Sequence, residues 1–244
     1  MEENRNFRMG LRDGLPIGLG YLSVSFAFGI FGVTSGLSVI ECVMISLFNL
    51  TSAGQLAAVP IIVSGGGFIE LALTQLIINL RYSLMSISLS QKLGKSVRLR
   101  DRFIISFANT DEIFAVASSK GMPVGREYLF GLAIYPIAGW TLGTTLGALA
   151  GNVLPAILVN SLGIAIYAMF IAIVIPTART EGRVALCVLT SAALSLLFYY
   201  LPPLNKIPSG FSIIITATVA SLIFAVAAPI ESGDRRRSPV LSRG

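Results

Sequence analysis

The sequence contains no histidine, only two cysteines and few charged residues. The lack of histidine excludes Ser–His and Cys–His nucleophilic catalysis as well as histidine metal sites. Cys42 and Cys187 both lie inside apolar runs without metal-ligand spacing, so we expect neither a disulfide nor a metal site. A nucleotide-binding glycine loop is also lacking. Within the apolar segments, Asp111 and Glu112 are the one adjacent acid pair available for catalysis, but an aspartyl dyad needs carboxylates from separate segments. We therefore expect no cofactor and no enzymatic activity.

The shortage of charge indicates a membrane protein. Charged residues make up 12% of the chain and hydrophobic residues 54%, with a mean hydropathy of +0.80. A soluble domain would carry about a quarter charged residues. The sequence therefore predicts a single integral membrane domain over residues 1–244, with polar tails at 1–13 and 231–244, in a bacterial cytoplasmic (inner) membrane. The net charge of +6 comes from basic residues in short loops beside apolar runs, which favours contact with a lipid bilayer over nucleic acid.

Apolar runs set the expected architecture, which is all-α and polytopic. A membrane-spanning helix needs about 20 residues, and about six runs satisfy this length: 14–34, 66–90, 126–150, 153–176, 182–201 and 209–229. Two further segments are irregular. Residues 38–64 are interrupted by the polar string NLTSAGQLAAV, and residues 103–119 are short and carry Asp111 and Glu112.

Basic residues favour a topology in which the two irregular segments, 38–64 and 103–119, enter the membrane and turn back. The loop at 92–102 carries five Lys or Arg residues, and it faces the cytoplasm together with both termini in that arrangement. The alternative has seven crossings with the N-terminus outside, and 38–64 then crosses as a broken helix. In both arrangements, non-helical backbone at membrane depth must face protein or a water-filled cavity.

Two glycine-rich runs resemble each other weakly. GLPIGLGYLSVSFAFGIFG and GLAIYPIAGWTLGTTLGALAG each have a proline near the start and small residues after it. Such runs are typical either of the internal repeats of transporters or of helices that approach closely through small residues.

The interruption within 38–64 predicts a new helix start. Thr51 or Ser52 can cap that start, and Gly54 lets the backbone open there. The first N–H groups of such a helix lack partners and favour a carboxylate, to which Gln55 would add an amide. The alternative interpretation is a glycine-containing packing contact.

Five ionisable residues lie within the apolar segments: Glu41, Glu70, Arg81, Asp111 and Glu112. Each costs about 2.5–3.5 kcal/mol at a helix centre, so such residues usually face a cavity or a partner. We expect Arg81 to pair with Asp111 or Glu112, either to lock two segments together or also to meet a substrate carboxylate. The remaining acid would hold an ammonium group or carry a proton, unless both acids merely cap a short helix. Glu41 and Glu70 lie near segment ends and are weaker candidates.

Three motifs in order carry a family resemblance: Gly54-Gln55 in SAGQLAAV, Asn79-Leu80-Arg81 in NLRYSLMS, and Thr110-Asp111-Glu112 in NTDEIFAV. Together with LPIGLGYLSVSFAFG, they resemble the AzlC family of branched-chain amino acid exporters over residues 8–230. The chain departs from the family pattern in having Gly54 before the glutamine and Leu56 after it. The resemblance implies export of small hydrophobic amino acids and a small AzlD-like membrane subunit as partner.

The predicted function is therefore a secondary active, proton-coupled exporter of branched-chain or other small hydrophobic amino acids. A channel, or a substrate-binding subunit of a larger membrane complex, is the alternative. Asp111 and Glu112 are the candidates for proton coupling, Phe107 and Phe114 could line an apolar pocket, and the chain could form a higher oligomer. The predicted substrate-binding residues are Ser52, Gly54, Gln55, Asn79, Arg81, Asn109, Thr110, Asp111 and Glu112.

Overall fold

The structure, a computed structural model, describes residues 4, 6–151, 153–155, 171, 174–176 and 178–227. The chain divides into two compact units, residues 1–172 and 173–244. Helices make up nearly all of the described residues, as predicted. The first unit contains α1 (Phe7–Thr34), α2 (Val39–Phe48), α3 (Ser52–Val63), α4 (Phe68–Ser90), α5 (Leu99–Phe107), α6 (Asp111–Ser118) and α7 (Arg126–Gly151). In the second unit, α9 (Gly182–Tyr200) and α10 (Ser209–Ala227) pack against each other and are joined through the 3-10 helix η1 (Leu204–Lys206).

Among the described residues, α1, α7, α9 and α10 are long and apolar enough to cross a membrane. The apolar run at 66–90 becomes α4, a helix of 23 residues, and the run at 153–176 lies largely outside the described residues. Since α1 begins at Phe7, residues 7–13 of the expected polar tail are helical. The tail at 231–244 lies outside the described residues. The prediction of one domain stays a prediction.

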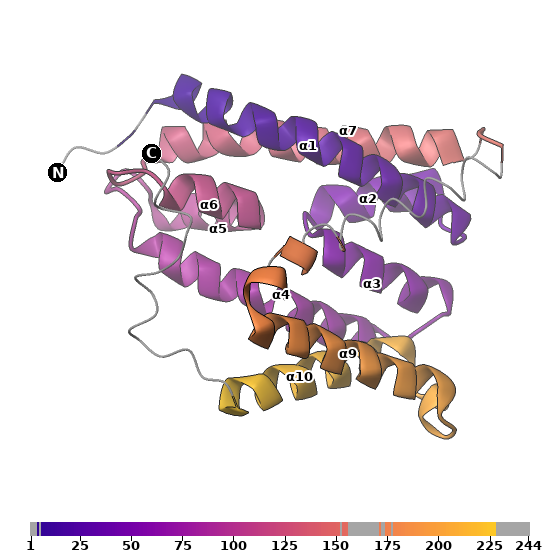
Figure 1. The fold of residues 1–244 in the computed structure, drawn as a ribbon. Helices are drawn as coiled ribbons and strands as arrows, with labels where there is room; N and C mark the ends of the chain where they lie inside the picture. Colours follow the sequence, from indigo (N-terminus) through magenta and orange to yellow (C-terminus); the bar gives the residue numbers. More distant parts are fainter. Residues whose placement is uncertain are drawn as a thin grey trace. The chain divides into compact units, whose positions relative to one another are not determined.

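The helices α1 and α7 lie side by side over their whole length and run in the same direction (Figure 1). Their backbones touch where glycines face each other: a Cβ added at Gly139 would collide with the carbonyl oxygen of Gly18, and one at Gly147 with that of Phe26. Glycine recurs every fourth residue in GWTLGTTLGALAG, so one face of α7 has no side chains. The two weakly similar runs therefore pack directly on each other.

The segment 38–64 turns back on itself. It forms α2 and α3 with a break at 49–51, and its two ends lie together, because a Cβ at Gly36 would be 3.8 Å from Cγ1 of Val63. Leu50, in the break, packs with Tyr21 and Trp140 in the middle of α1 and α7. The chain therefore enters and leaves at the same end of the bundle, so the seven-crossing alternative, in which 38–64 crosses once, is wrong.

The segment 103–119 also turns back, and its helical part begins earlier than predicted, at Leu99. The break at 108–110 separates α5 from α6. Its two ends lie together, since Lys92, before α5, donates through Nζ to the carbonyl oxygen of Lys120, after α6, at 2.8 Å.

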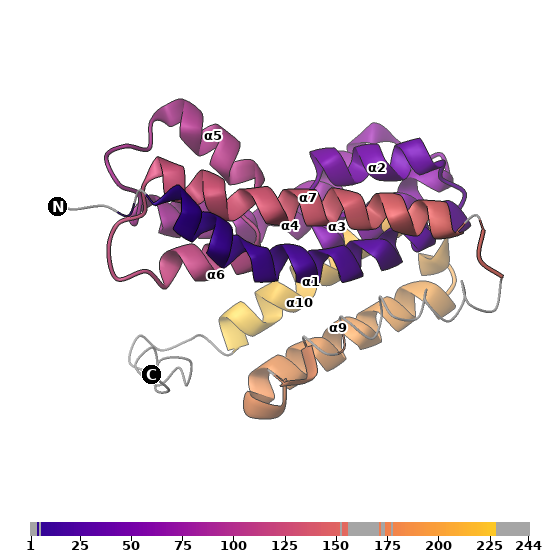
Figure 2. The ribbon, with the colours of Figure 1, turned by 90° about the horizontal axis from the view of Figure 1, so that it is seen from above.

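The two broken segments occupy opposite ends of the bundle. The pair α5 and α6 lies beside the first residues of α7, and α2 and α3 lie beside its last residues (Figures 1 and 2). The core has the same division. Ile105 and Ala117 pack with Tyr128 and Leu132, while Cys42 and Val59 pack with Ala148. The breaks thus face each other near the middle of the unit, beside α4.

Candidate functional site

The site is built around two helix starts. Thr51 caps α3, and its side chain accepts a hydrogen bond from the Gly54 N–H at 3.3 Å. Thr110 occupies the corresponding cap of α6, but its hydroxyl shares a hydrogen bond of 2.6 Å with the Tyr21 hydroxyl and makes no cap bond to the helix. Both threonines are buried. The two starts differ in charge, because α3 has no acid in its first turn and α6 begins with Asp111 and Glu112.

A polar stripe on α4 connects the two breaks. Gln75, Asn79, Tyr82 and Ser86 follow each other at intervals of four, three and four residues, so they share one helix face. Near the first break, Gln75 donates to the carbonyl oxygen of Gly54 at 2.8 Å, and the Thr51 hydroxyl donates to Asn79 Oδ1 at 3.0 Å. Near the second break, Ser86 accepts a hydrogen bond from Asn109 Nδ2 at 3.0 Å.

A cavity of about 140 Å³, here called the polar cavity, lies where the breaks and the stripe meet. Among the described residues, no Asp, Glu, Lys or Arg lines it. Its amides, hydroxyls and apolar rings can hold a small polar ligand that brings its own charges. The lining residues are Phe48, Asn49, Leu50, Thr51, Asn79, Tyr82, Ser106, Phe107, Asn109 and Thr110.

Asn109 brings an unpaired acceptor to this lining. It is buried, at 3% exposed, and its Oδ1 has no hydrogen-bond partner among the described residues. A buried acceptor without a donor costs about 1–3 kcal/mol. Its amide group is already held by Ser86. The free oxygen is therefore suited to accept an N–H or O–H group from a ligand.

The two adjacent acids have different partners. Asp111 Oδ2 lies 2.8 Å from Arg81 Nη1, and both side chains are about half exposed, at 45% and 49%. Arg81 also donates to the Tyr82 hydroxyl at 3.1 Å, so its guanidinium is held against the stripe. Glu112 instead accepts a hydrogen bond from Tyr21 on α1. The expected pairing of Arg81 with one of the acids is confirmed, and its partner is Asp111.

Gln55 has a different environment from the other candidates, since it is fully buried between helices. It donates to Ser46 at 2.9 Å and accepts from the indole N–H of Trp140 at 3.1 Å. Ser46 in turn shares a hydrogen bond of 2.6 Å with Thr144. Trp140 packs edge-on against Tyr21, with ring centroids 5.1 Å apart. This chain of contacts ties α3 to α2, α7 and α1.

The structure therefore divides the nine predicted binding residues. Asn79, Asn109 and Thr110 line the polar cavity, and Ser52 begins the helix that Thr51 caps. Gly54 lies beneath Gln75, where a Cβ would be 2.6 Å from Oε1 of that side chain. The others, Gln55, Arg81, Asp111 and Glu112, do not line the cavity. Their roles in binding stay predictions.

The weaker candidates lie elsewhere. Glu41 closes a capping box with Ser38 at the start of α2, and Glu70 is buried in the first turn of α4. Neither lines the polar cavity. Phe107 lines that cavity, whereas Phe114 packs against the core beside α7. Among the described residues, no group of three or more Cys, Asp or Glu side chains could hold a metal ion.

Several residues of the site were not predicted from the sequence. One helix face of the apolar run 66–90 carries the polar residues Gln75, Asn79, Tyr82 and Ser86. This spacing could have predicted their place in the site, because a polar stripe on an apolar helix indicates a buried polar contact. Tyr21 and Trp140 carried no such signal, since each stands alone in a glycine-rich run. Their partners lie far away in the sequence.

Long apolar helices, two segments that break and turn back, and a polar cavity between the breaks are typical of a multi-pass membrane protein. The comparisons with known proteins agree. The chain belongs to the AzlC family, whose model, described as AzlC protein, matches residues 16–154.

Two relatives are also membrane proteins. An uncharacterized membrane protein of Archaeoglobus fulgidus is 30% identical over 203 residues, which cover 82% of this chain and 88% of that one. Inner membrane protein YgaZ of Escherichia coli is 29% identical over 190 residues, which cover 75% of this chain and 76% of that protein. No solved structure matches the chain.

Proposed function

We propose that this protein is a secondary active transporter that exports small hydrophobic amino acids, such as the branched-chain ones, across the cytoplasmic membrane. The observation that carries the proposal is the meeting of two broken helices and the α4 stripe around the polar cavity. Backbone breaks at membrane depth need protein or water as partners. In transporters, discontinuous helices of this kind form substrate sites.

The two helix starts fit the two ends of a zwitterion. The start of α3 has no acid in its first turn, so its partial positive charge favours the carboxylate. At the start of α6, Asp111 and Glu112 reverse that preference and favour the ammonium group. The free Oδ1 of Asn109 lies beside this second start and accepts an ammonium N–H.

Glu112 is the better candidate for proton coupling. Asp111 forms an ion pair with Arg81 at 2.8 Å, so a proton taken up there would break that pair. Glu112 is bound by the uncharged hydroxyl of Tyr21 and can therefore gain or lose a proton without breaking an ion pair. A proton taken up there would weaken the attraction for the ammonium group and help to release the cargo.

We also propose a small AzlD-like membrane subunit as the partner, in line with the family resemblance. The test is to reconstitute the chain in liposomes with and without that subunit and to measure leucine flux under an imposed pH gradient. We expect leucine to accumulate against its gradient when both subunits are present, and accumulation to vanish when the pH gradient is removed. Flux that only equilibrates leucine would indicate a channel, and leucine binding without flux would indicate a substrate-binding subunit. Either result would contradict the proposal.

A further inference from the structure

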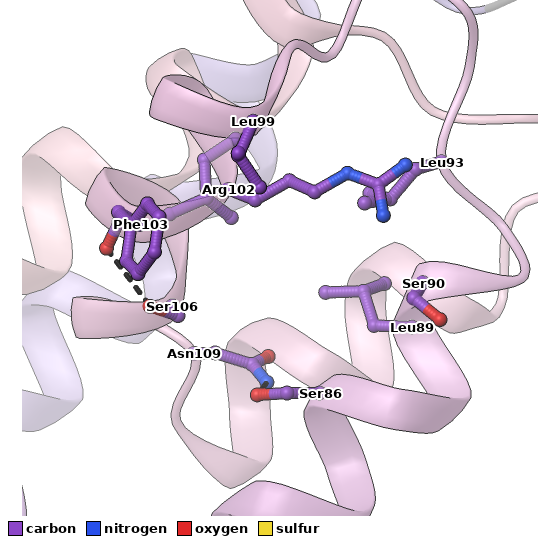
Figure 3. A pocket seen from close by; sticks show the side chains of 10 residues that line it. Ser86, Leu89, Ser90, Leu93, Leu99, Arg102, Phe103, Ser106 and Asn109 are labelled. Carbon is purple, nitrogen blue, oxygen red and sulfur yellow. Dashed lines mark hydrogen bonds between the residues drawn. The ribbon is translucent and has the colours of Figure 1, made fainter.

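A second cavity, of about 230 Å³, lies between the end of α4 and α5 and is here called the apolar cavity (Figure 3). Its walls are mainly apolar, with Leu89 and Leu93 on one side and Leu99, Phe103 and Ile105 on the other, although the long side chain of Arg102 and three serines also line it. Leu89 and Ile105 are its most enclosed apolar residues, at 4% and 6% exposed.

The two cavities adjoin, because Ser106 and Asn109 line both of them. Asn109 therefore stands at the junction, with its amide held by Ser86 and its oxygen without a partner among the described residues. On one side of this junction the lining combines amides and hydroxyls with apolar side chains, and on the other it is mainly apolar. An amphipathic molecule placed across the junction would match both.

We propose that the apolar cavity holds the side chain of the transported amino acid, and that Leu89 and Ile105 set the upper limit on its size. The inference rests on the proposed function, since it places the cargo's carboxylate and ammonium groups in the polar cavity. The α-carbon then lies near Asn109. A cavity of about 150 Å³ already holds benzene, so the volume suffices for an aliphatic side chain. A lipid acyl chain fits the apolar walls but offers no donor to the Asn109 oxygen.

The test is a change of size selectivity. Ile105→Ala and Leu89→Ala widen the cavity, and we expect each to raise phenylalanine transport relative to leucine by about tenfold, as a difference of one or a few methylenes does in other binding pockets. Ile105→Phe narrows the cavity and should favour alanine over leucine. The measurement is competition of unlabelled amino acids of graded size against labelled leucine in proteoliposomes.

Ile104→Ala is the matched control. Ile104 is the neighbour of Ile105 on α5, but it is 58% exposed and does not line the apolar cavity. Its variant should keep the selectivity of the wild type. Should an alanine variant fail to fold, Ile105→Val and Leu89→Val widen the cavity less and should shift selectivity in the same direction.

The outcomes separate the two proposals. A wild-type protein without amino acid flux contradicts the proposed function. A transporting wild type whose selectivity is unchanged in every folded Leu89 and Ile105 variant overturns the inference alone. Native mass spectrometry adds an independent outcome: a phospholipid bound to the wild type and lost in Ile105→Phe, with selectivity unchanged, would assign the cavity to lipid.

Discussion

Replacing Arg81 with alanine is expected to lower leucine flux by about 100-fold while the protein still inserts in the membrane. Arg81 lies 2.8 Å from Asp111 beside the polar cavity. Without Arg81, the site loses the positive charge that holds Asp111 and could meet the substrate carboxylate, and a loss of about 2.8 kcal/mol in substrate binding corresponds to a factor of 100. Asp111→Asn should have a similar effect, because it leaves the guanidinium alone. Flux is measured in proteoliposomes containing equal amounts of protein.

The double variant Arg81→Ala/Asp111→Ala separates a structural lock from a role in binding. The double variant lacks both the guanidinium and the carboxylate and therefore contains no unpaired charge. It should be at least as stable as either single variant. If Arg81 also meets the substrate carboxylate, flux stays low in this variant. Recovery of flux would show that the pair only holds α4 against α6. The control is Arg100→Ala, because Arg100 is 69% exposed, approaches Asp101 only at 3.9 Å and should be dispensable.

Gly18→Ala is expected to destabilise the protein by about 1–3 kcal/mol, the usual cost of an added methyl group in a tightly packed contact. A Cβ at Gly18 would lie 2.7 Å from the carbonyl carbon of Tyr135 and 2.9 Å from its Cβ. Because the obstacle is largely backbone, α1 and α7 must move apart. Thermal unfolding of the purified protein in detergent measures the change.

Gly20→Ala is the control in the same helix. A Cβ at Gly20 meets nothing within 4 Å, so the substitution brings only the better helix propensity of alanine, worth about 1 kcal/mol. We expect an unchanged or slightly higher unfolding temperature. Equal losses of stability in the two variants would contradict close backbone packing as the basis of the α1–α7 contact.

The sequence predicts the hairpins better than it predicts the site. The interruptions marked 38–64 and 103–119 as irregular, and the five basic residues at 92–102 favoured an arrangement in which both segments turn back. Thr51 and Gly54 located the first break, because a capping side chain and a glycine are local signals of a new helix start. The second break was harder to place, because Leu99–Phe107 contains three charged residues and reads as part of a basic loop.

The cross-helix partners could not be predicted, because they depend on the way α1 and α7 pack. Gln55 reads as a binding residue in the sequence, but Trp140 and Ser46 use its amide once the helices are assembled. Likewise, the sequence alone does not tell which of the two neighbouring acids, Asp111 or Glu112, pairs with Arg81. Their side chains point about 100° apart on a helix, so Asp111 can reach Arg81 while Glu112 reaches Tyr21.

If the substrate occupies the polar cavity between the two broken segments, it should protect cysteines placed there from chemical labelling. In a chain with Cys42→Ser and Cys187→Ser, Phe48→Cys and Phe107→Cys each place one thiol on the polar cavity, one from each segment. Gly67→Cys and Lys95→Cys are exposed controls in the loops after α3 and before α5.

We expect leucine to slow maleimide labelling of both Phe48→Cys and Phe107→Cys. Protection should be half-maximal at the concentration that half-saturates transport, while the controls label at an unchanged rate. Unchanged labelling at both cavity positions, in variants that still transport leucine, would show that the substrate does not occupy this cavity.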